Sequence, residues 1–299
     1  MADEHSLNVQ TSGTALATAY MRALSASAPG KEIKGGDDLA VIFLTDEQRK
    51  SLKDPVARAW VLQNRISPGA YGFMLARTSF FDQIVQDALM ENVGQIVFLG
   101  AGYDSRPYRF GRLIQDTLLF EVDTGPTQDR KKDCLRAAQI SISAQIRFVS
   151  LNFDTEDLAE GLIKAGFSRG KSTLFVWEGV TYYLSADVVN SMLAFVRSNT
   201  PPGSSICFDY AALSAEALNE KGAGEMRKLL RSQYSNEPAR FGIRAGQIEA
   251  FLASRGFAIV QHLTAAEMTG KYLPTNGHWG LGEVPLLFCL VHAKSNGHD

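Results

Sequence analysis

The sequence predicts an α/β fold built on a doubly wound, mostly parallel sheet of seven strands. Short apolar segments alternate with helix-like segments from residue 95 onward, and a glycine turn follows the first apolar segment. The residues before 90 have helical periodicity instead, which indicates a separate cover. We therefore expect an N-terminal helical cap over 1–90, a main domain over 91–294 and a flexible tail over 295–299.

The expected strands are short, apolar and separated in most cases by a segment that fits a helix. They cover residues 95–99, 118–122, 146–149, 173–177, 205–209, 258–262 and 286–292. Alternation of this kind implies crossover connections and parallel pairing. The last two segments have no clear helix between them, so we expect the final strand to run antiparallel to its neighbours.

Local signals predict where several helices begin and end. Ser79, with Asp82 three residues later, is typical of a capping box and predicts a helix that starts before the apolar stripe from Phe80. The expected N-caps are Ser105, which precedes Pro107, together with Thr155 and Ser185. Helix ends are expected just before Gly166 and Gly256.

The region 211–244 is long for a connection between a strand and a helix. Its residues 216–234 favour a helix, and we interpret the whole region as a lid inserted over the carboxyl edge of the sheet. Ligands bind at that edge in open parallel sheets. The lid and the N-terminal helices are therefore candidate walls of a substrate pocket, and the alternative is that they are packing elements without a ligand contact.

The composition excludes several classes of function. The chain has 299 residues, of which 45% are hydrophobic and 21% charged, and its net charge is −2. The chain has no excess of basic residues, which would indicate binding to nucleic acid. It also has no apolar run long enough to span a membrane. The N-terminus lacks the apolar core of a secretory signal. Cys134, Cys207 and Cys289 are too far apart for a disulfide framework or a zinc site, so we expect a cytoplasmic protein without a metal.

The glycine turn predicts a nucleotide site. Residues 98–107 read Phe-Leu-Gly-Ala-Gly-Tyr-Asp-Ser-Arg-Pro, and Asp123 ends the next expected strand, 21 positions after Gly102 (123 − 102). Glycines let the backbone approach a ligand, and an acid at the next strand tip accepts hydrogen bonds from ribose hydroxyls. The dinucleotide fingerprint needs a third glycine where this chain has Ser105, so the pattern favours S-adenosylmethionine over NAD.

Residues 98–106 resemble the signature of the leucine carboxyl methyltransferase family and its bacterial and fungal relatives. Four further segments match that family in order: Ala76-Arg77-Thr78 before Phe80-Phe81-Asp82, residues 120–123 with Lys131 downstream, residues 148–153, and residues 177–184. The resemblance extends from about Arg77 to about Val291. It implies a class I methyltransferase fold, which is Rossmann-like, and S-adenosyl-L-methionine as the cofactor.

The resemblance also implies a set of cofactor-binding residues. Arg77 would hold the methionine carboxylate in a guanidinium fork, and Glu178 would receive the methionine ammonium. The remaining cofactor contacts would come from Gly100, Gly102 and Asp104 in the turn, Asp123 at the ribose, and Asn152 and Phe153 at the adenine. The chain departs from the family at Phe98 and at Asn152, where the family often has acids.

Taken singly, three of these residues also have a purely local interpretation. Arg77 could be a surface charge near a helix start. Glu178 could interact with a helix dipole, and Asp123 could cap the turn that follows it.

The acceptor determines which catalytic groups the site needs. A carboxylate is already ionised near pH 7 and needs only a clamp and a dry pocket, whereas a phenol with a pKa near 10 needs a base. The clamp candidates are Arg106, Arg109 and Arg244, although a local salt bridge is an equal interpretation of Arg106. Tyr183, with its neighbour Tyr182, is expected to line the pocket. His278 is the candidate base, while His262 and His292 are expected to be structural.

We therefore expect an S-adenosylmethionine-dependent O-methyltransferase that forms a methyl ester, and the resemblance implies a small, polyketide-like acid as its acceptor. The same family with a phenolic acceptor is one alternative, and methylation of a protein C-terminus is another. From other classes, an NAD-dependent dehydrogenase and a cofactor-binding protein without catalysis remain open. No nucleic acid or membrane partner is expected.

Overall fold

The apolar segments after residue 95 form the central sheet of the protein. The computed structural model describes residues 13–27, 35–66, 69–153, 155–219, 241–273 and 283–297. Its strands are β1 (Gln95–Leu99), β2 (Leu118–Asp123), β3 (Ile146–Ser150), β4 (Thr173–Trp177), β5 (Ser205–Leu213), β6 (Ile243–Arg244), β7 (Phe257–Leu263) and β8 (Phe288–Ser295). All seven expected strands are present, and β6 is a short addition that pairs with the end of β5.

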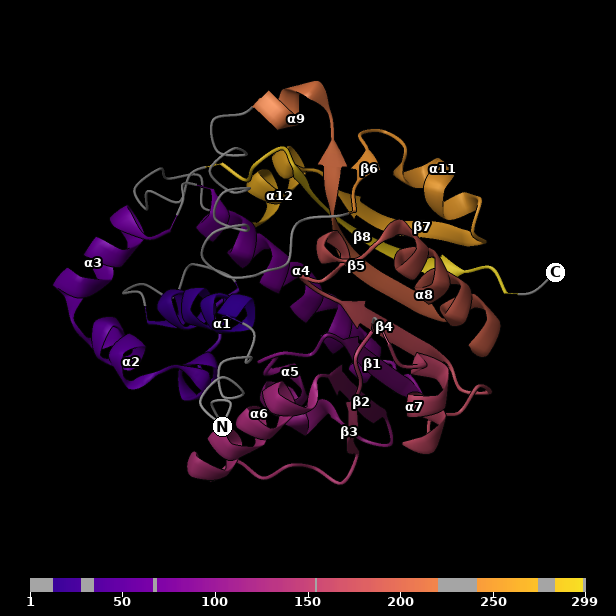
Figure 1. Ribbon diagram of the computed structural model, residues 1–299, viewed down its shortest axis with the longest axis horizontal. Helices are drawn as coiled ribbons and strands as arrows, with labels where there is room; N and C mark the ends of the chain where they lie inside the picture. Colours follow the sequence, from indigo (N-terminus) through magenta and orange to yellow (C-terminus); the bar gives the residue numbers. More distant parts are fainter. Residues whose placement is uncertain are drawn as a thin grey trace, which may run out of the picture.

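The strand order is β3-β2-β1-β4-β5-β8-β7 (Figure 1). Strands β1 to β5 pair in parallel. Strand β8 runs antiparallel between β5 and β7, with His292 opposite Cys207. The order reverses beside β1, so the carboxyl ends of β1 and β4 diverge there and leave room for a ligand. The predicted fold class and the antiparallel final strand are confirmed.

Helices cover both faces of this sheet. The α-helices are α1 (Gly13–Ala26), α2 (Asp46–Lys53), α3 (Pro55–Asn64), α4 (Ala70–Met90), α5 (Arg106–Arg109), α6 (Gly125–Ala137), α7 (Leu158–Lys164), α8 (Ala186–Asn199), α9 (Ala215–Asn219), α11 (Ile248–Ala253) and α12 (Ala265–Tyr272). Short 3-10 helices are η2 (Ala40–Phe43), η3 (Gly111–Leu113) and η4 (Thr181–Tyr183). Among the described helices, none is long and apolar enough to cross a lipid bilayer.

The alternation of side chains along β1 divides the core into two layers. Val97 and Leu99 pack with α7, α8 and α11, whereas Ile96 and Phe98 pack with α4 and α12. Each strand residue therefore contributes to one face only, as a pleated sheet requires. Phe98, where the family often has an acid, is buried in the layer of α4.

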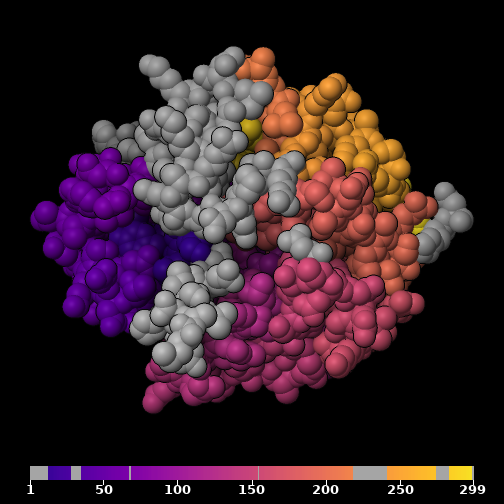
Figure 2. Space-filling view, in the orientation of Figure 1, coloured from indigo at the N-terminus to yellow at the C-terminus, as the bar shows by residue number. Residues whose placement is uncertain are grey.

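The N-terminal helices form a third cluster at the carboxyl end of the sheet. Helices α1 and η2 contribute Tyr20, Leu24 and Phe43, and the ring of Phe43 stacks at 5.3 Å on Tyr103, directly after the glycine turn. Figure 2 shows this part of the chain in indigo, beside the magenta and orange sheet domain. The N-terminal helices are therefore placed beside the predicted cofactor site.

Some predicted helix ends are confirmed. The Ser185 side chain accepts a hydrogen bond from the Val188 backbone N–H, and Gly166 follows α7 with a φ of +98°. Ser105 precedes α5, although its side chain makes no capping hydrogen bond there. Gly256, with a φ of +78°, follows α11 two residues after its C-cap.

Other predicted helix boundaries are wrong. Ser79 does not start a helix, because α4 already begins at Ala70 and is buried on nearly all sides, which hides its periodicity. Asp157, not Thr155, caps α7. Helix α12 lies between the last two expected strands, although we expected none there. Of the predicted lid 211–244, residues 220–240 lie outside the described part of the chain.

Candidate active site

The glycine turn lies between the ends of β1 and β2. Gly100 and Gly102 have positive φ angles of 69° and 45°, which favour glycine. A Cβ on Gly100 would lie 2.5 Å from the Val180 side chain. The backbone N–H groups of Gly100 and Ala101 both donate to the Val122 carbonyl, at 2.9 Å. The turn is therefore fixed against the second strand and presents bare backbone to the carboxyl edge.

Asp123 connects this turn to the next strand tip. One carboxylate oxygen accepts the Gly102 N–H at 2.7 Å, and the other accepts the Thr124 N–H at 2.7 Å. The second oxygen also accepts the Thr124 hydroxyl at 3.3 Å, so the oxygen bound to Gly102 is the one that retains a lone pair for a ribose hydroxyl. Burial raises the pKa of Asp123 above its ordinary value. Its contact with Thr124 fits the local capping interpretation, but its contact with the turn is what a nucleotide site needs.

Asn152 and Phe153 follow β3 on the far side of Asp123. The Leu151 N–H donates to the Asp123 carbonyl at 3.0 Å, which holds this loop beside Asp123. Asn152 is exposed and Phe153 is half-buried against the core. Both therefore lie in the loop that follows β3, next to Asp123.

Arg77 and Glu178 meet at the switch point of the sheet. The Arg77 Nε lies 3.0 Å from the Glu178 Oε1 in a buried ion pair. Neither atom has an aligned hydrogen bond within the described residues. The pair brings together a guanidinium, which suits a carboxylate, and a carboxylate, which suits an ammonium, and these are the two charged groups of a methionine moiety. Arg77 is 5% exposed, so the surface-charge interpretation is wrong.

Asp209 on β5 completes this arrangement, and sequence reasoning missed it. Its carboxylate accepts from Arg77 Nη1 at 2.9 Å, from the Gly179 N–H at 2.7 Å and from the Tyr182 hydroxyl. Burial alone would lower the pKa of Arg77, but the carboxylates of Asp209 and Glu178 raise it, so the guanidinium stays charged. An acid inside an otherwise apolar strand was the available signal.

Arg106 is held in the same network. Its guanidinium contacts Asp82, Asp104 and Glu178, each at 2.7 Å, and it is 1% exposed. The salt-bridge interpretation of Arg106 is therefore what the structure shows, and an acceptor carboxylate would have to displace one of these three acids. Asp104 also accepts the Arg106 backbone N–H at 2.8 Å, so its contacts orient Arg106.

The connected ion pairs within the described residues join four arginines to five carboxylates. They are Arg22, Arg77, Arg106 and Arg109 with Asp37, Asp82, Asp104, Glu178 and Asp209. The excess of one carboxylate favours a cationic ligand such as a sulfonium with an ammonium group. Arg109 is occupied here by Asp82 and Asp37. The third clamp candidate, Arg244, is exposed on β6.

A cavity of about 630 Å³ opens from Arg77 and Gly179 toward the N-terminal helices. Tyr182 and Tyr183 both line it, as predicted, and the hydroxyl of Tyr182, which is 4% exposed, also donates to Asp209. The wall is largely apolar and aromatic: it includes Leu16, Tyr20, Met21, Trp60, Val61, Ile66, Phe73, Met74 and Phe288. The cap helices α1 to α3 thus form most of a ligand-sized pocket beside the cofactor residues.

Two of the remaining histidines have structural surroundings, and the predicted base lies outside the described residues. His278 belongs to the segment 274–282, which the structure does not describe. The His262 ring nitrogen hydrogen-bonds the Tyr210 hydroxyl at 2.9 Å. His292 is largely buried on β8, and burial lowers its pKa to about 4.

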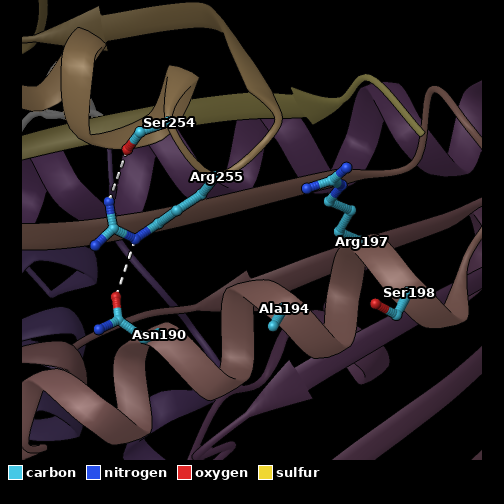
Figure 3. A pocket seen from close by; sticks show the side chains of 6 residues that line it. All are labelled: Asn190, Ala194, Arg197, Ser198, Ser254 and Arg255. Atoms are coloured by element: carbon cyan, nitrogen blue, oxygen red, sulfur yellow. Dashed lines mark hydrogen bonds between the residues drawn. The ribbon is translucent and has the colours of Figure 1, made fainter. Parts of the chain in front are cut away.

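A second hollow, of about 600 Å³, lies between α8 and the end of α11 (Figure 3). Arg197 and Arg255 extend into it from opposite sides. Arg255 donates to Asn190 at 2.9 Å and lies 3.7 Å above the Phe251 ring. This hollow is near the amino ends of β5 and β7, away from the edge where open parallel sheets bind ligands.

The comparisons with known proteins agree with this geometry. The sequence pattern of the leucine carboxyl methyltransferase family matches residues 15–197. The chain belongs to this family. A Bacillus subtilis relative named as an S-adenosyl-L-methionine-dependent methyltransferase is 33% identical over 215 residues, which are 71% of this chain and 68% of the relative.

Other family members carry the same name. A relative from Streptomyces avermitilis is 31% identical over 207 residues, covering 68% of this chain and 71% of its own. The match to a Mycobacterium bovis relative, at 31% identity, covers 52% of this chain and about half, 48%, of that protein.

Solved structures confirm the fold class. A structure from Thermobifida fusca, described as a methyltransferase, has a TM-score of 0.58 at 15% identity and covers 93% of this chain and 94% of its own. A Streptomyces avermitilis structure has a TM-score of 0.54 at 14% identity, covering 93% and 96%. Family and fold together establish an S-adenosylmethionine-dependent methyltransferase, and the NAD alternative is set aside.

Proposed function

We propose that this family member forms a methyl ester on the carboxylate of a small, largely apolar acid. The observation that carries this proposal is the cavity that reaches Arg77 and Gly179. Its volume of about 630 Å³ lies within the range of small-molecule sites, and its wall is mostly apolar and aromatic. A flat or extended hydrophobic acid fits such a wall better than a polar metabolite does.

The charged groups around the cavity support a carboxylate rather than a phenol. Within the described residues, the charged lining consists of Arg65, Arg77 and Glu47, and it contains neither a histidine nor a lysine. Burial raises the pKa of Tyr182 far above its ordinary value of 10, so this hydroxyl is no base near neutral pH. A carboxylate acceptor needs no deprotonation there.

S-adenosylmethionine supplies an electrophilic methyl group on its sulfonium. The protein orients the two substrates and excludes water from the acceptor. Asp123 would hold the ribose end, and Arg77 and Glu178 would hold the methionine end, beside the cavity that reaches Gly179. The aromatic side chains of Phe73, Tyr183 and Phe288 exclude water from the acceptor. Loss of hydration makes the carboxylate oxygen a better nucleophile.

The experiment is a methyl-transfer assay with labelled S-adenosylmethionine and a panel of aromatic and aliphatic acids and phenols. Mild alkali hydrolyses methyl esters to volatile methanol but leaves aryl methyl ethers intact. We expect base-labile label on acids and none on phenols. Base-stable label on a phenol would replace this proposal with the phenolic alternative. Binding of S-adenosylhomocysteine without transfer to any acceptor would contradict it.

A further inference from the structure

Two charged groups of the acceptor cavity, Glu47 and Arg65, form no ion pair inside the described part of the chain. Arg77 is paired with Asp209 and Glu178. Glu47 is exposed in the first turn of α2, where the helix dipole stabilises a carboxylate. Arg65 makes no ion pair among the described residues, although it lines the same cavity.

Arg65 is exposed, and its side chain lies against an aromatic ring. It is the C-cap residue of α3, and its guanidinium carbon lies 5.4 Å from the centre of the Trp60 ring. Trp60 is 51% exposed and lines the cavity too. A guanidinium over an aromatic face keeps its N–H edges available, and these edges match a carboxylate or phosphate. The end of α3 further favours a cation at this position.

Helix α4 forms one long wall of this cavity. Ala70, Phe73, Met74 and Arg77 line the cavity along one face of α4. Seven residues separate the first from the last, so they span about 10 Å at 1.5 Å per residue. Arg65 precedes the start of α4, whereas Gly179 and Arg77 mark the other end. The residues of α4 that line the cavity thus give it the length of a small molecule, with Arg65 and Arg77 both in its lining.

We propose that the acceptor carries a second anionic group, remote from the methylated carboxylate, which Arg65 binds beside Trp60. This inference rests on the proposed function, since it takes the Arg77 end as the place of methyl transfer. The substrate class is then an elongated, apolar or aromatic molecule with an acidic group at each end. Arg65 acts as a specificity-determining residue that orients the acceptor in one direction.

The test measures binding of two matched probes to the protein loaded with S-adenosylhomocysteine. The probes are biphenyl dicarboxylate, with one carboxylate on each terminal carbon, and the biphenyl monocarboxylate of the same shape. Isothermal titration is carried out on the full chain, on Arg65→Met and on the control Arg112→Met, which removes an exposed arginine outside the cavity. We expect the wild type and the control to bind the diacid at least tenfold more tightly than the monoacid.

In Arg65→Met, this preference should fall to within twofold while S-adenosylhomocysteine binding stays unchanged. Equal affinity for the two probes in the wild type, no binding of either, or an unchanged preference in Arg65→Met would each overturn the inference. Methyl transfer to the same probes is measured separately. Ester formation without a diacid preference leaves the proposed function standing alone, whereas an Arg65-dependent preference without ester formation contradicts only the proposed function.

Discussion

The two halves of the active site are built from different chemical groups. The cofactor half contains buried charges in contact with one another, such as Arg77 with Asp209 and Arg106 with Asp82. The acceptor half is an apolar cavity whose walls come mainly from helices α1 to α4. Buried charges with fixed partners hold one invariant ligand precisely, whereas an apolar wall can change its shape between relatives without a charge penalty.

The largest expected effect comes from the cofactor half. Asp209→Ala would leave Arg77, the Gly179 N–H and the Tyr182 hydroxyl without their shared acceptor. Removing one partner of a buried pair costs about 3–5 kcal/mol in the free energy of unfolding. Urea denaturation measures this loss. The control is Asp133→Ala, which breaks an exposed pair with Arg136 and should cost at most about 0.5 kcal/mol. Equal stability of the two variants would show that the network is not what holds the site.

Asp123→Ala should weaken cofactor binding more than it weakens folding. The variant leaves the ribose hydroxyls and the Gly102 N–H without an acceptor, at a cost of roughly 1–3 kcal/mol in binding free energy. Titration calorimetry with S-adenosylhomocysteine measures the change. Asp129→Ala on the exposed side of α6 provides a matched loss of charge and should bind like the wild type. Unchanged affinity in Asp123→Ala would remove this residue from the site.

His292 provides a buried titratable group outside the ion-pair network. Burial first, and then the charge of Lys294, lowers the pKa of His292 from 6.5 to about 4. The unfolded chain therefore binds a proton between these two pH values and the folded chain does not. The stabilising effect of this neutral histidine is complete above pH 6.5 and is lost as the pH falls toward 4.

Between pH 7 and pH 5 the histidine alone should lower the free energy of unfolding by about 2 kcal/mol. Urea denaturation at both pH values measures this difference for the wild type and for His292→Gln. The variant should lose less stability than the wild type by that amount. The same pH dependence in both proteins would contradict the assignment.

The smallest expected effect belongs to the acceptor half. Met21→Ala removes a half-buried side chain from the cavity wall on α1, which costs about 1 kcal/mol of acceptor contact. We expect kcat/KM for the acceptor to fall severalfold while the Kd for S-adenosylhomocysteine stays constant. Met90→Ala, at the exposed end of α4, is the control. A parallel loss of cofactor affinity in Met21→Ala would contradict the separation of the two halves.

The strands of the sheet could be predicted from the sequence because each of them is a local apolar segment. It also indicated Asp123 and the glycine turn, whose roles depend on positions at strand ends. Helix α12 was missed although Thr264 and Glu267 form a capping box, a signal that local reading could have used. The first turns of α4 were missed because a helix buried on all sides shows no apolar stripe.

The ion pairs of the site could not be predicted from the sequence in the same way. Arg77 and Asp209 are 132 positions apart, and the fold alone brings them together. Arg106 had two equal interpretations until its three carboxylate partners were placed around it. The acceptor cavity depends on helices from the N-terminal region, whose positions over the sheet follow from tertiary packing rather than from local pattern.

A crystal structure with S-adenosylhomocysteine bound tests the account most directly. We expect the homocysteine carboxylate to bind at Arg77 Nε, the ammonium at Glu178 Oε1 and the ribose hydroxyls at Asp123. The sulfur should face the cavity beside Gly179. A ligand bound elsewhere, or one whose sulfur is separated from the cavity by protein, would contradict it.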